Sequence, residues 1–155
     1  MADLSAPFFD TSVLVAGLID FGETSRSALE VVDAIADGRI TRPLTAWHCC
    51  LEFFSVATRL PEEYRLEPET ALRFLKEEVL ARFDVAGLAR AAREEFLAAA
   101  VGEGAVGGRI YDAHIAEVAR RMGASIVVTE NRRHFTSLLR HGVQVLLCEE
   151  LATEL

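Results

Sequence analysis

The sequence contains little lysine, few cysteines and no long apolar segment. Its basic residues number 16, and Lys76 is the only lysine among them. Cys49, Cys50 and Cys148 form no CxxC pair, and adjacent cysteines are poorly placed to form a disulfide or bind one zinc ion, so we expect buried, reduced thiols. No apolar run approaches the roughly 20 residues that span a bilayer, and the N-terminus lacks a basic leader followed by a long apolar run. We therefore expect no membrane segment and a cytoplasmic location.

Length and composition predict one globular domain over residues 1–155, with its core at about 7–147. A content of 51% hydrophobic and 26% charged residues excludes disordered and fibrous proteins. The net charge of −8 opposes sequence-independent binding to phosphate backbones. Arginine nevertheless suits bidentate phosphate contacts, although its abundance is equally consistent with genomic base composition. An acidic chain also accommodates a cluster of carboxylates around a bound cation.

The hydrophobic pattern alternates between short apolar runs and segments of helical period, and Gly or Pro separates many of them. This alternation is typical of an α/β fold with a parallel sheet and helices on both faces, in which ligands bind beyond the carboxyl ends of the strands. We expect strands at 7–9, 40–43, 83–85, 125–129 and 143–147, and helices from Asp10 onward, at 25–37, 44–60, 68–80, 88–101, 109–122 and 132–140.

Three acidic residues stand at positions where a solvated carboxylate is unexpected. Asp10 lies where the first strand turns into a helix, at the sheet edge where 129–131 also emerges if the strands are parallel, although an Asp there can simply cap the helix. Glu52 interrupts an apolar helical run. Asp112 lies in the first turn of its helix, where the helix dipole favours an anion, yet it shares a face with Ile115 and Ala119.

Burying an unpaired carboxylate costs several kcal/mol, so three of them require a counter-charge. No lysine is placed to serve all three, whereas one divalent cation could, and oxygen ligands favour Mg²⁺ or Mn²⁺ over zinc or copper. Separate arginine partners are the structural alternative. The residues thus predict a metal site at Asp10, Glu52 and Asp112.

Four motifs in register resemble a PIN domain, and their order and spacing are similar to the VapC toxins of bacterial toxin–antitoxin pairs. The resemblance extends from about residue 7 to residue 147. The motifs are FDTSVL at 9–14, Glu52 in its apolar helix, GRIYDA at 108–113 and VVTENRRHF at 127–135.

The resemblance implies a three-layer α/β/α fold with a central parallel sheet and a Mg²⁺- or Mn²⁺-dependent endoribonuclease. It assigns Asp10, Glu52 and Asp112 as metal ligands and catalytic residues. Thr11 or Ser12 would orient Asp10 or a water, and Thr129 and Asn131 would hold the far side of the site. The resemblance also implies a homodimer, neutralisation by a small antitoxin, and an RNA substrate for which transfer RNA is one candidate.

One departure concerns the fourth acid of the family, an Asp that often lies three residues after the Asn of the last motif. His134 stands there, and it could replace the acid as a ligand, hydrogen-bond a water or only pack; we favour the hydrogen-bonding role, with Glu130 as a weaker substitute. Arg109, Arg132 and Arg133 begin helices beside the expected site and could contact neighbouring phosphates, or could simply be solvated.

We therefore predict a metal-dependent ribonuclease, and two alternatives stay open. In the first, a catalytically impaired PIN-like module binds RNA or a protein, which the missing fourth acid would favour. The second is a small-molecule phosphoesterase, for which the chain lacks a Gly-rich phosphate loop or a DxD start.

Overall fold

The computed structural model describes the backbone of residues 1–155 and every side chain except that of residue 140. Short strands alternate with helices along the whole chain. The elements are β1 (Pro7–Phe9), α1 (Thr11–Leu18), η1 (Gly22–Ser25), α2 (Arg26–Ala36), β2 (Leu44–Ala46), α3 (Trp47–Ala57), α4 (Pro68–Phe74), η2 (Leu75–Leu80), β3 (Asp84–Ala86), η3 (Arg90–Ala92), α5 (Arg93–Gly102), α6 (Arg109–Arg121), β4 (Ile126–Val128), η4 (Arg132–His141), β5 (Gln144–Leu146) and α7 (Cys148–Ala152).

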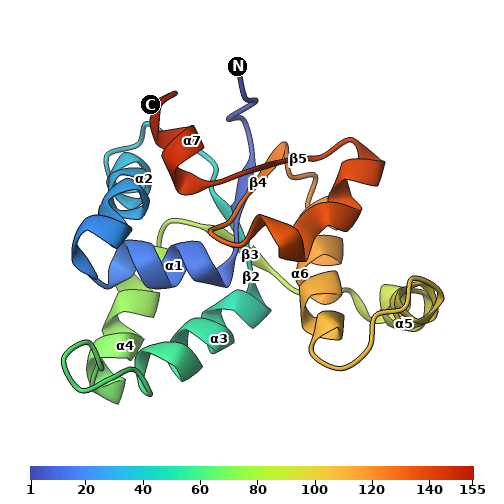
Figure 1. Cartoon of the computed structure of the whole chain (residues 1–155), viewed down its shortest axis with the longest axis horizontal. Coiled ribbons are helices and arrows are strands. Elements are labelled where there is room, and N and C mark those ends of the chain that lie inside the picture. Colours follow the sequence, from blue (N-terminus) through green and yellow to red (C-terminus); the bar gives the residue numbers. More distant parts are fainter.

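The five strands form one parallel sheet in the order β3-β2-β1-β4-β5. In the middle of the sheet, Phe8 of β1 lies opposite Leu44 of β2 and Val127 of β4. Helices α1, α2 and α4 lie on one side of the sheet and α5 and α6 on the other (Figure 1). The predicted α/β/α fold with a central parallel sheet is therefore confirmed.

The direction in which the chain moves across the sheet reverses once. From β1 it proceeds through β2 to β3, and it then crosses back to β4 and β5 on the other side of β1. Because parallel crossovers are right-handed, this reversal sends α5 and α6 to the face opposite α1 and α2. The carboxyl ends of β1 and β4 consequently form a topological switch point, the usual ligand position in such sheets.

Apolar side chains from the sheet and both helical layers form the core. Strands β1, β2 and β4 are buried along their whole length, as expected for central parallel strands. Helices α1 and α2 approach closely at Gly17, where an added Cβ would lie 2.4 Å from Val32 Cγ2. Cys49, Cys50 and Cys148 are buried free thiols, as predicted. Among the helices that the structure describes, none combines the length and apolar character needed to cross a membrane.

Two element predictions near residue 44 were wrong. The strand expected at 40–43 does not form: Ile40 is buried, but it closes a turn by donating its N–H to Ala34 O. The strand instead follows Pro43 and occupies Leu44–Ala46, which we had expected to begin a helix. Pairing with β1 and β3 on either side stabilises this extended segment, and α3 begins only at Trp47.

Candidate metal and RNA-binding site

Asp10 lies at the switch point and is held by two hydroxyl groups. It directly follows β1, and its side chain is buried. Ser12 Oγ donates to Asp10 Oδ1 at 2.5 Å, and Thr129 Oγ1, just beyond β4, donates to Asp10 Oδ2 at 2.9 Å. Ser12 Oγ in turn accepts the N–H of Glu130, and Thr129 Oγ1 accepts that of Asn131. The ends of β1 and β4 are thus joined through one carboxylate.

The surroundings of Asp10 disfavour its negative charge. Burial raises the pKa of Asp10 from 3.8 to about 6, and the hydrogen bonds from Ser12 and Thr129 offset only part of that effect. Asp10 occupies the position before α1, and the first N–H groups of that helix lower its pKa slightly without meeting hydrogen-bond geometry. Asp10 makes no side-chain capping hydrogen bond to α1, which argues against a capping role. Within the described part of the chain, no basic side chain forms an ion pair with Asp10, which argues against an arginine partner.

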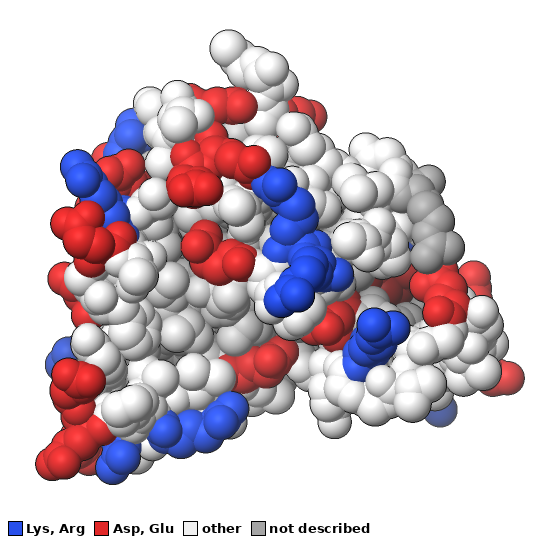
Figure 2. Space-filling model, in the orientation of Figure 1, with Lys and Arg blue, Asp and Glu red and all other residues white. Residues whose placement is uncertain are grey.

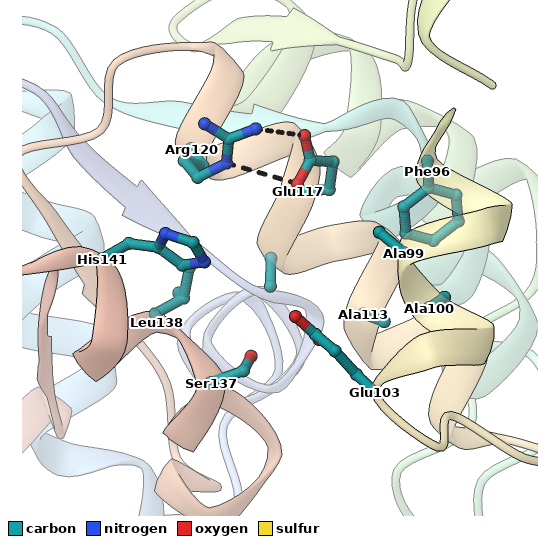
Figure 3. Close-up of a pocket in the computed structure, with 11 residues that line it drawn as sticks. Phe96, Ala99, Ala100, Glu103, Ala113, Glu117, Arg120, Ser137, Leu138 and His141 are labelled. Carbon is teal, nitrogen blue, oxygen red and sulfur yellow. Dashed lines mark hydrogen bonds and ion pairs between the residues drawn. The ribbon is translucent and has the colours of Figure 1, made fainter. Parts of the chain in front are cut away.

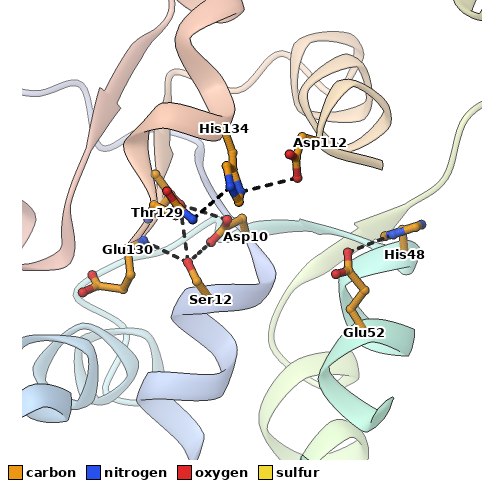
Figure 4. Close-up of polar contacts among 9 residues, drawn as sticks. Asp10, Ser12, His48, Glu52, Asp112, Thr129, Glu130 and His134 are labelled. Carbon is orange, nitrogen blue, oxygen red and sulfur yellow. Dashed lines mark hydrogen bonds and ion pairs between the residues drawn. The ribbon is translucent and has the colours of Figure 1, made fainter. Parts of the chain in front are cut away.

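Asp112 in the first turn of α6 faces His134 of η4. Asp112 Oδ1 lies 3.5 Å from His134 Nδ1, and 30% of the Asp112 side chain is exposed. Asn131 Nδ2 lies 3.0 Å from His134 Nε2, so with the amide donating, the ring carries its proton on Nδ1, toward Asp112. Burial raises the pKa of Asp112, while the charges of His134, Arg109 and His48 oppose that rise. His134 therefore spans the space between Asn131 and Asp112 (Figure 4).

Glu52 in the second turn of α3 faces His48, one helical turn earlier. His48 Nε2 lies 2.8 Å from Glu52 Oε1, but the contact does not meet hydrogen-bond geometry, and Oε1 is buried with no hydrogen-bond partner in the described chain. The Glu52 side chain as a whole is 41% exposed, because its neighbours Leu51 and Phe54 lie on an outward-facing apolar surface. The expectation that the Glu52 carboxylate would be shielded from solvent was therefore wrong for the side chain as a whole, although Oε1 is buried.

The three carboxylates approach one edge of the sheet without converging. His134 lies between Asp10 and Asp112, and the pair of Glu52 and His48 stands apart from them (Figure 4). Among the side chains that the structure describes, no three His, Cys, Asp or Glu groups are close enough to hold one metal ion. Carboxylates at one sheet edge repel one another, and a divalent cation is a group that can offset that repulsion. The donor types fit a hard divalent ion, but the three-carboxylate ligand set stays a prediction.

A cleft of about 440 Å³ opens beside Asp112 and His134. Arg109 and Arg133 line it, whereas Arg132 is turned to an ion pair with Glu150. Acidic side chains lie within the depression on this face of the molecule, and basic side chains border it (Figure 2). Two of the three arginines that we expected to contact phosphate, Arg109 and Arg133, thus line the cleft.

Two other predicted residues point elsewhere. Glu130 Oε1 accepts the N–H of Cys148 at the start of α7, and its carboxylate turns away from His134 (Figure 4), so it does not stand in for the missing fourth acid. The Thr11 hydroxyl is buried without a hydrogen-bond partner in the described chain, so Ser12 is the residue that orients Asp10.

A smaller cavity of about 60 Å³ lies between α5, α6 and η4 (Figure 3). Its charged groups include Glu117 and Arg120, which bind each other through a two-point contact, Arg120 Nη2 to Glu117 Oε1 at 2.7 Å and Nε to Oε2 at 3.3 Å. Because that pair is mutually satisfied and lies toward the far end of α6 from Asp112, we do not include this cavity in the site.

Sequence reasoning missed His48. The signal was present, since His48 and Glu52 are four residues apart on one helix and such residues are neighbours on its surface. The contact of His48 with α6 could not be predicted in this way, because its ring stacks at 5.5 Å on Tyr111, which is distant in the sequence.

Comparisons with known proteins agree with this architecture. The PIN domain family matches residues 8–138. No curated protein matches the chain. Among solved structures, PAE2754 from Pyrobaculum aerophilum has a TM-score of 0.62 at 22% identity, covering 99% of this chain and 90% of its own. FitAcB from Neisseria gonorrhoeae has a TM-score of 0.59 at 16% identity, covering 90% and 96%. VapBC2 from Rickettsia felis, bound to a promoter DNA fragment, has a TM-score of 0.56 at 12% identity, covering 92% and 98%. At these identities the structures show a shared fold, and the match over residues 8–138 shows that the chain belongs to the PIN domain family.

Proposed function

We propose that this protein is a divalent-metal-dependent endoribonuclease and the toxin of a VapBC-type toxin–antitoxin pair. PIN domains are generally nucleases, which agrees with the family match. The observation that carries the proposal is Asp10, a buried carboxylate at the switch point whose side chain is held by neutral hydroxyls. A carboxylate in this position lacks a counter-charge that a cation would supply.

Asp10, Asp112 and Glu52 would hold Mg²⁺ or Mn²⁺. The buried Oε1 of Glu52, which has no hydrogen-bond partner in the described chain, fits that role. A bound divalent ion would supply Lewis-acid polarisation of a phosphodiester and a more acidic water. Bringing Glu52 to the other two acids requires that its contact with His48 be exchanged for the ion.

The remaining polar residues would bind and orient. Ser12 and Thr129 hold the Asp10 carboxylate, and Asn131 holds His134 against Asp112. Arg109 and Arg133 would bind the phosphates on either side of the scissile bond, because their guanidinium groups line the cleft and suit phosphate oxygens.

A cleavage assay tests the proposal. Purified protein is incubated with RNA in Mn²⁺, in Mg²⁺ and in a chelator, together with Asp10→Asn, Asp112→Asn and, as a control, Asp33→Asn on the exposed face of α2. We expect metal-dependent cutting by the wild type and the control and its loss in both site variants. Cutting that survives in the chelator, or in both site variants, would refute the proposal.

His134 gives a second test of the same site. Imidazole suits softer ions than Mg²⁺, so we expect activity in Mn²⁺ to exceed activity in Mg²⁺, and His134→Asp to shift the ratio toward Mg²⁺. His141→Asp at the other end of η4 is the matched control. An unchanged metal preference in His134→Asp would contradict this role.

The partners belong to the proposal as well. The fold is shared with FitAcB and VapBC2, and the VapBC2 structure contains a promoter DNA fragment, which supports a small antitoxin partner. We expect growth arrest on expression of this chain alone and its relief by a short protein encoded beside it. A homodimer would be tested by sedimentation.

Two observations support the alternative of a binding module that does not cleave. The described side chains include no preformed cluster of three metal-binding groups, and His134 stands in place of the fourth acid. In that case RNA would bind with the same affinity in Mn²⁺ and in chelator and would stay intact.

A further inference from the structure

Thr45 is a polar residue in the interior of an apolar sheet. It is the only polar residue of β1, β2 and β4, whose other positions hold Pro, Phe, Leu, Ala, Ile and Val. Central parallel strands are buried on both faces, so an apolar residue would be the usual choice at this position. Burying a hydroxyl costs free energy unless a hydrogen bond compensates, so the presence of Thr45 calls for a specific partner.

That partner is the backbone beside Asp10. Thr45 Oγ1 donates to Phe9 O at 2.8 Å, and both residues are completely buried. Phe9 O belongs to the peptide group that joins Phe9 to Asp10. The hydrogen bond therefore holds the backbone of Asp10 from the side of β2, in a place where water cannot replace it.

The Thr45 hydroxyl lies where β1 and β2 share few other contacts. In the described sheet, β1 is paired with β4 at three register positions but with β2 at one, Phe8 with Leu44. Asp10 is tied to β4 as well, because its N–H donates to Val128 O at 3.2 Å. Toward β2, by contrast, the position of Asp10 depends on the Thr45 hydroxyl.

Strand β2 leads directly into the helix that carries Glu52. Helix α3 begins shortly after Thr45. Burial raises the pKa of the Cys49 thiol in the first turn of α3 to about 12, and the charge of Asp10 raises it further. The hydroxyls of Thr11 and Thr45 lower the pKa of this thiol, so these groups all lie near it. Thr45 thus lies between the two segments that present Asp10 and Glu52.

We propose that Thr45 is a positioning residue of the metal site, and that its hydroxyl sets the spacing between Asp10 at the end of β1 and Glu52 on α3. The inference rests on the metal binding in the proposed function and adds a residue that itself touches neither metal nor RNA. Mg²⁺ requires near-ideal octahedral geometry with oxygen ligands at roughly 2.0 to 2.1 Å, whereas Ca²⁺ accepts flexible geometry at roughly 2.3 to 2.6 Å. A change in the spacing of the two carboxylates should therefore weaken Mg²⁺ binding more than Ca²⁺ binding.

Three variants of Thr45 isolate the contribution of the hydroxyl. Thr45→Val keeps most of the side-chain volume but has no hydroxyl. Thr45→Ser and Thr45→Ala leave the same gap in the core and differ from each other only in the hydroxyl. Isothermal titration calorimetry of the full chain with Mg²⁺ and, separately, with Ca²⁺ measures the two affinities without RNA or catalysis. The temperature is one at which circular dichroism shows each variant to be folded.

Loss of the hydroxyl should weaken Mg²⁺ binding by roughly 10-fold or more, as is typical for residues that orient metal ligands, and Ca²⁺ binding by a smaller factor. We expect this result for Thr45→Val and Thr45→Ala, whereas Thr45→Ser should retain the wild-type affinity for both ions. If Thr45→Val does not fold, the comparison of Thr45→Ser with Thr45→Ala decides the question.

Ser25→Ala is the matched control for a general loss of stability. Ser25 is equally buried, and it lies at the opposite end of α1 from Asp10. Its hydroxyl donates to Ile19 O at 3.1 Å and accepts the N–H of Phe21 at 3.0 Å. The variant should lower the melting temperature but leave both metal affinities unchanged. If it weakened Mg²⁺ binding as much as Thr45→Ala does, the effect at Thr45 would be a general loosening of the fold, and the proposal would be wrong.

Other results would also overturn the proposal. They are wild-type Mg²⁺ affinity in Thr45→Val and Thr45→Ala, equal losses for Mg²⁺ and Ca²⁺, and equal losses in Thr45→Ser and Thr45→Ala. RNA cleavage combined with any of these results would leave the proposed ribonuclease standing and refute only this inference. The expected pattern of affinities without RNA cleavage would do the reverse. If the wild type bound neither ion, both proposals would be refuted.

Discussion

Replacing Asp10 by Asn should stabilise the metal-free protein. In the folded chain, burial raises the pKa of Asp10 from 3.8 to about 6. At about 1.4 kcal/mol for each pKa unit, the charged carboxylate costs the folded state about 3 kcal/mol at neutral pH. Asn has the same shape without the charge, but its amide nitrogen must find an acceptor among hydroxyls that now donate, which costs about 1 kcal/mol. The expected net gain is about 2 kcal/mol.

The dependence on pH has a defined sign. Because the folded pKa of Asp10 lies above its unfolded value, the folded state binds this proton more tightly, and its contribution to stability falls as pH rises from 3.8 through about 6. The advantage of Asp10→Asn should be about 2 kcal/mol at pH 7.5 and about 0.6 kcal/mol at pH 5, and below pH 4 the variant should be slightly less stable than the wild type, because the charge cost disappears there and the amide cost remains. In a domain of this length, about 2 kcal/mol raises Tm by roughly 4 to 8 °C.

Thermal unfolding in a chelator at pH 5 and pH 7.5 measures this difference, with Asp33→Asn as a control that should stay within about 0.5 kcal/mol of the wild type. Adding Mn²⁺ should then stabilise the wild type alone, by about 2.7 kcal/mol at a hundred times Kd, and so remove the advantage of the variant. If Asp10→Asn were less stable than the wild type in chelator at pH 7.5, the reasoning about its buried charge would be refuted.

Two further predictions concern buried contacts at Thr129 and at Gly17. Thr129→Val leaves a buried Asp10 oxygen without its donor and should lower the free energy of unfolding by about 1 to 3 kcal/mol, measured by urea denaturation, whereas Thr129→Ser should keep most of the stability. Gly17→Ala places a Cβ 2.4 Å from Val32 Cγ2 and 3.0 Å from a backbone oxygen of α2, and should destabilise by about 1 to 3 kcal/mol. Gly87→Ala, where no atom lies within 4 Å of an added Cβ, is its control, and equal Tm values for the two variants would contradict the close packing of α1 and α2.

Much of the fold could be predicted because its signals are local. The apolar run before Asp10, the 3.6-residue period of α2 and the glycine after α6 each mark an element from neighbouring residues alone. Strand β2 could not be found in this way. Its three residues continue into α3 as one apolar stretch, and only pairing with β1 and β3, far away in the sequence, decides that they are extended.

In the candidate site too, some contacts could be predicted from the sequence and others depend on the packing of distant elements. Parallel neighbouring strands end at the same edge of a sheet, so the turn after β1 predicts that Asp10 and Thr129 lie close together. In the structure, Thr129 Oγ1 lies 2.9 Å from Asp10 Oδ2. The contact of His134 with Asp112 depends on how η4 packs against α6, and no spacing in the sequence reports that packing. A hollow lined by Trp47, Tyr111 and the loop before α5 likewise forms only when these distant segments come together.

The presence of a carboxylate at position 10 favours a functional role for this residue over a purely structural one. A network that only joined β1 to β4 would need donors and acceptors, and a neutral Asn between Ser12 and Thr129 would supply them with a smaller desolvation cost. A carboxylate at that position weakens the fold at neutral pH, and the described chain gives it no basic partner in return. In the proposed function, this charge binds something from outside, at the sheet edge where Asp112, Arg109 and Arg133 line an open cleft. A divalent cation together with a phosphodiester would meet that requirement, because the cation would neutralise the acids and the arginines would bind the remaining phosphate charge.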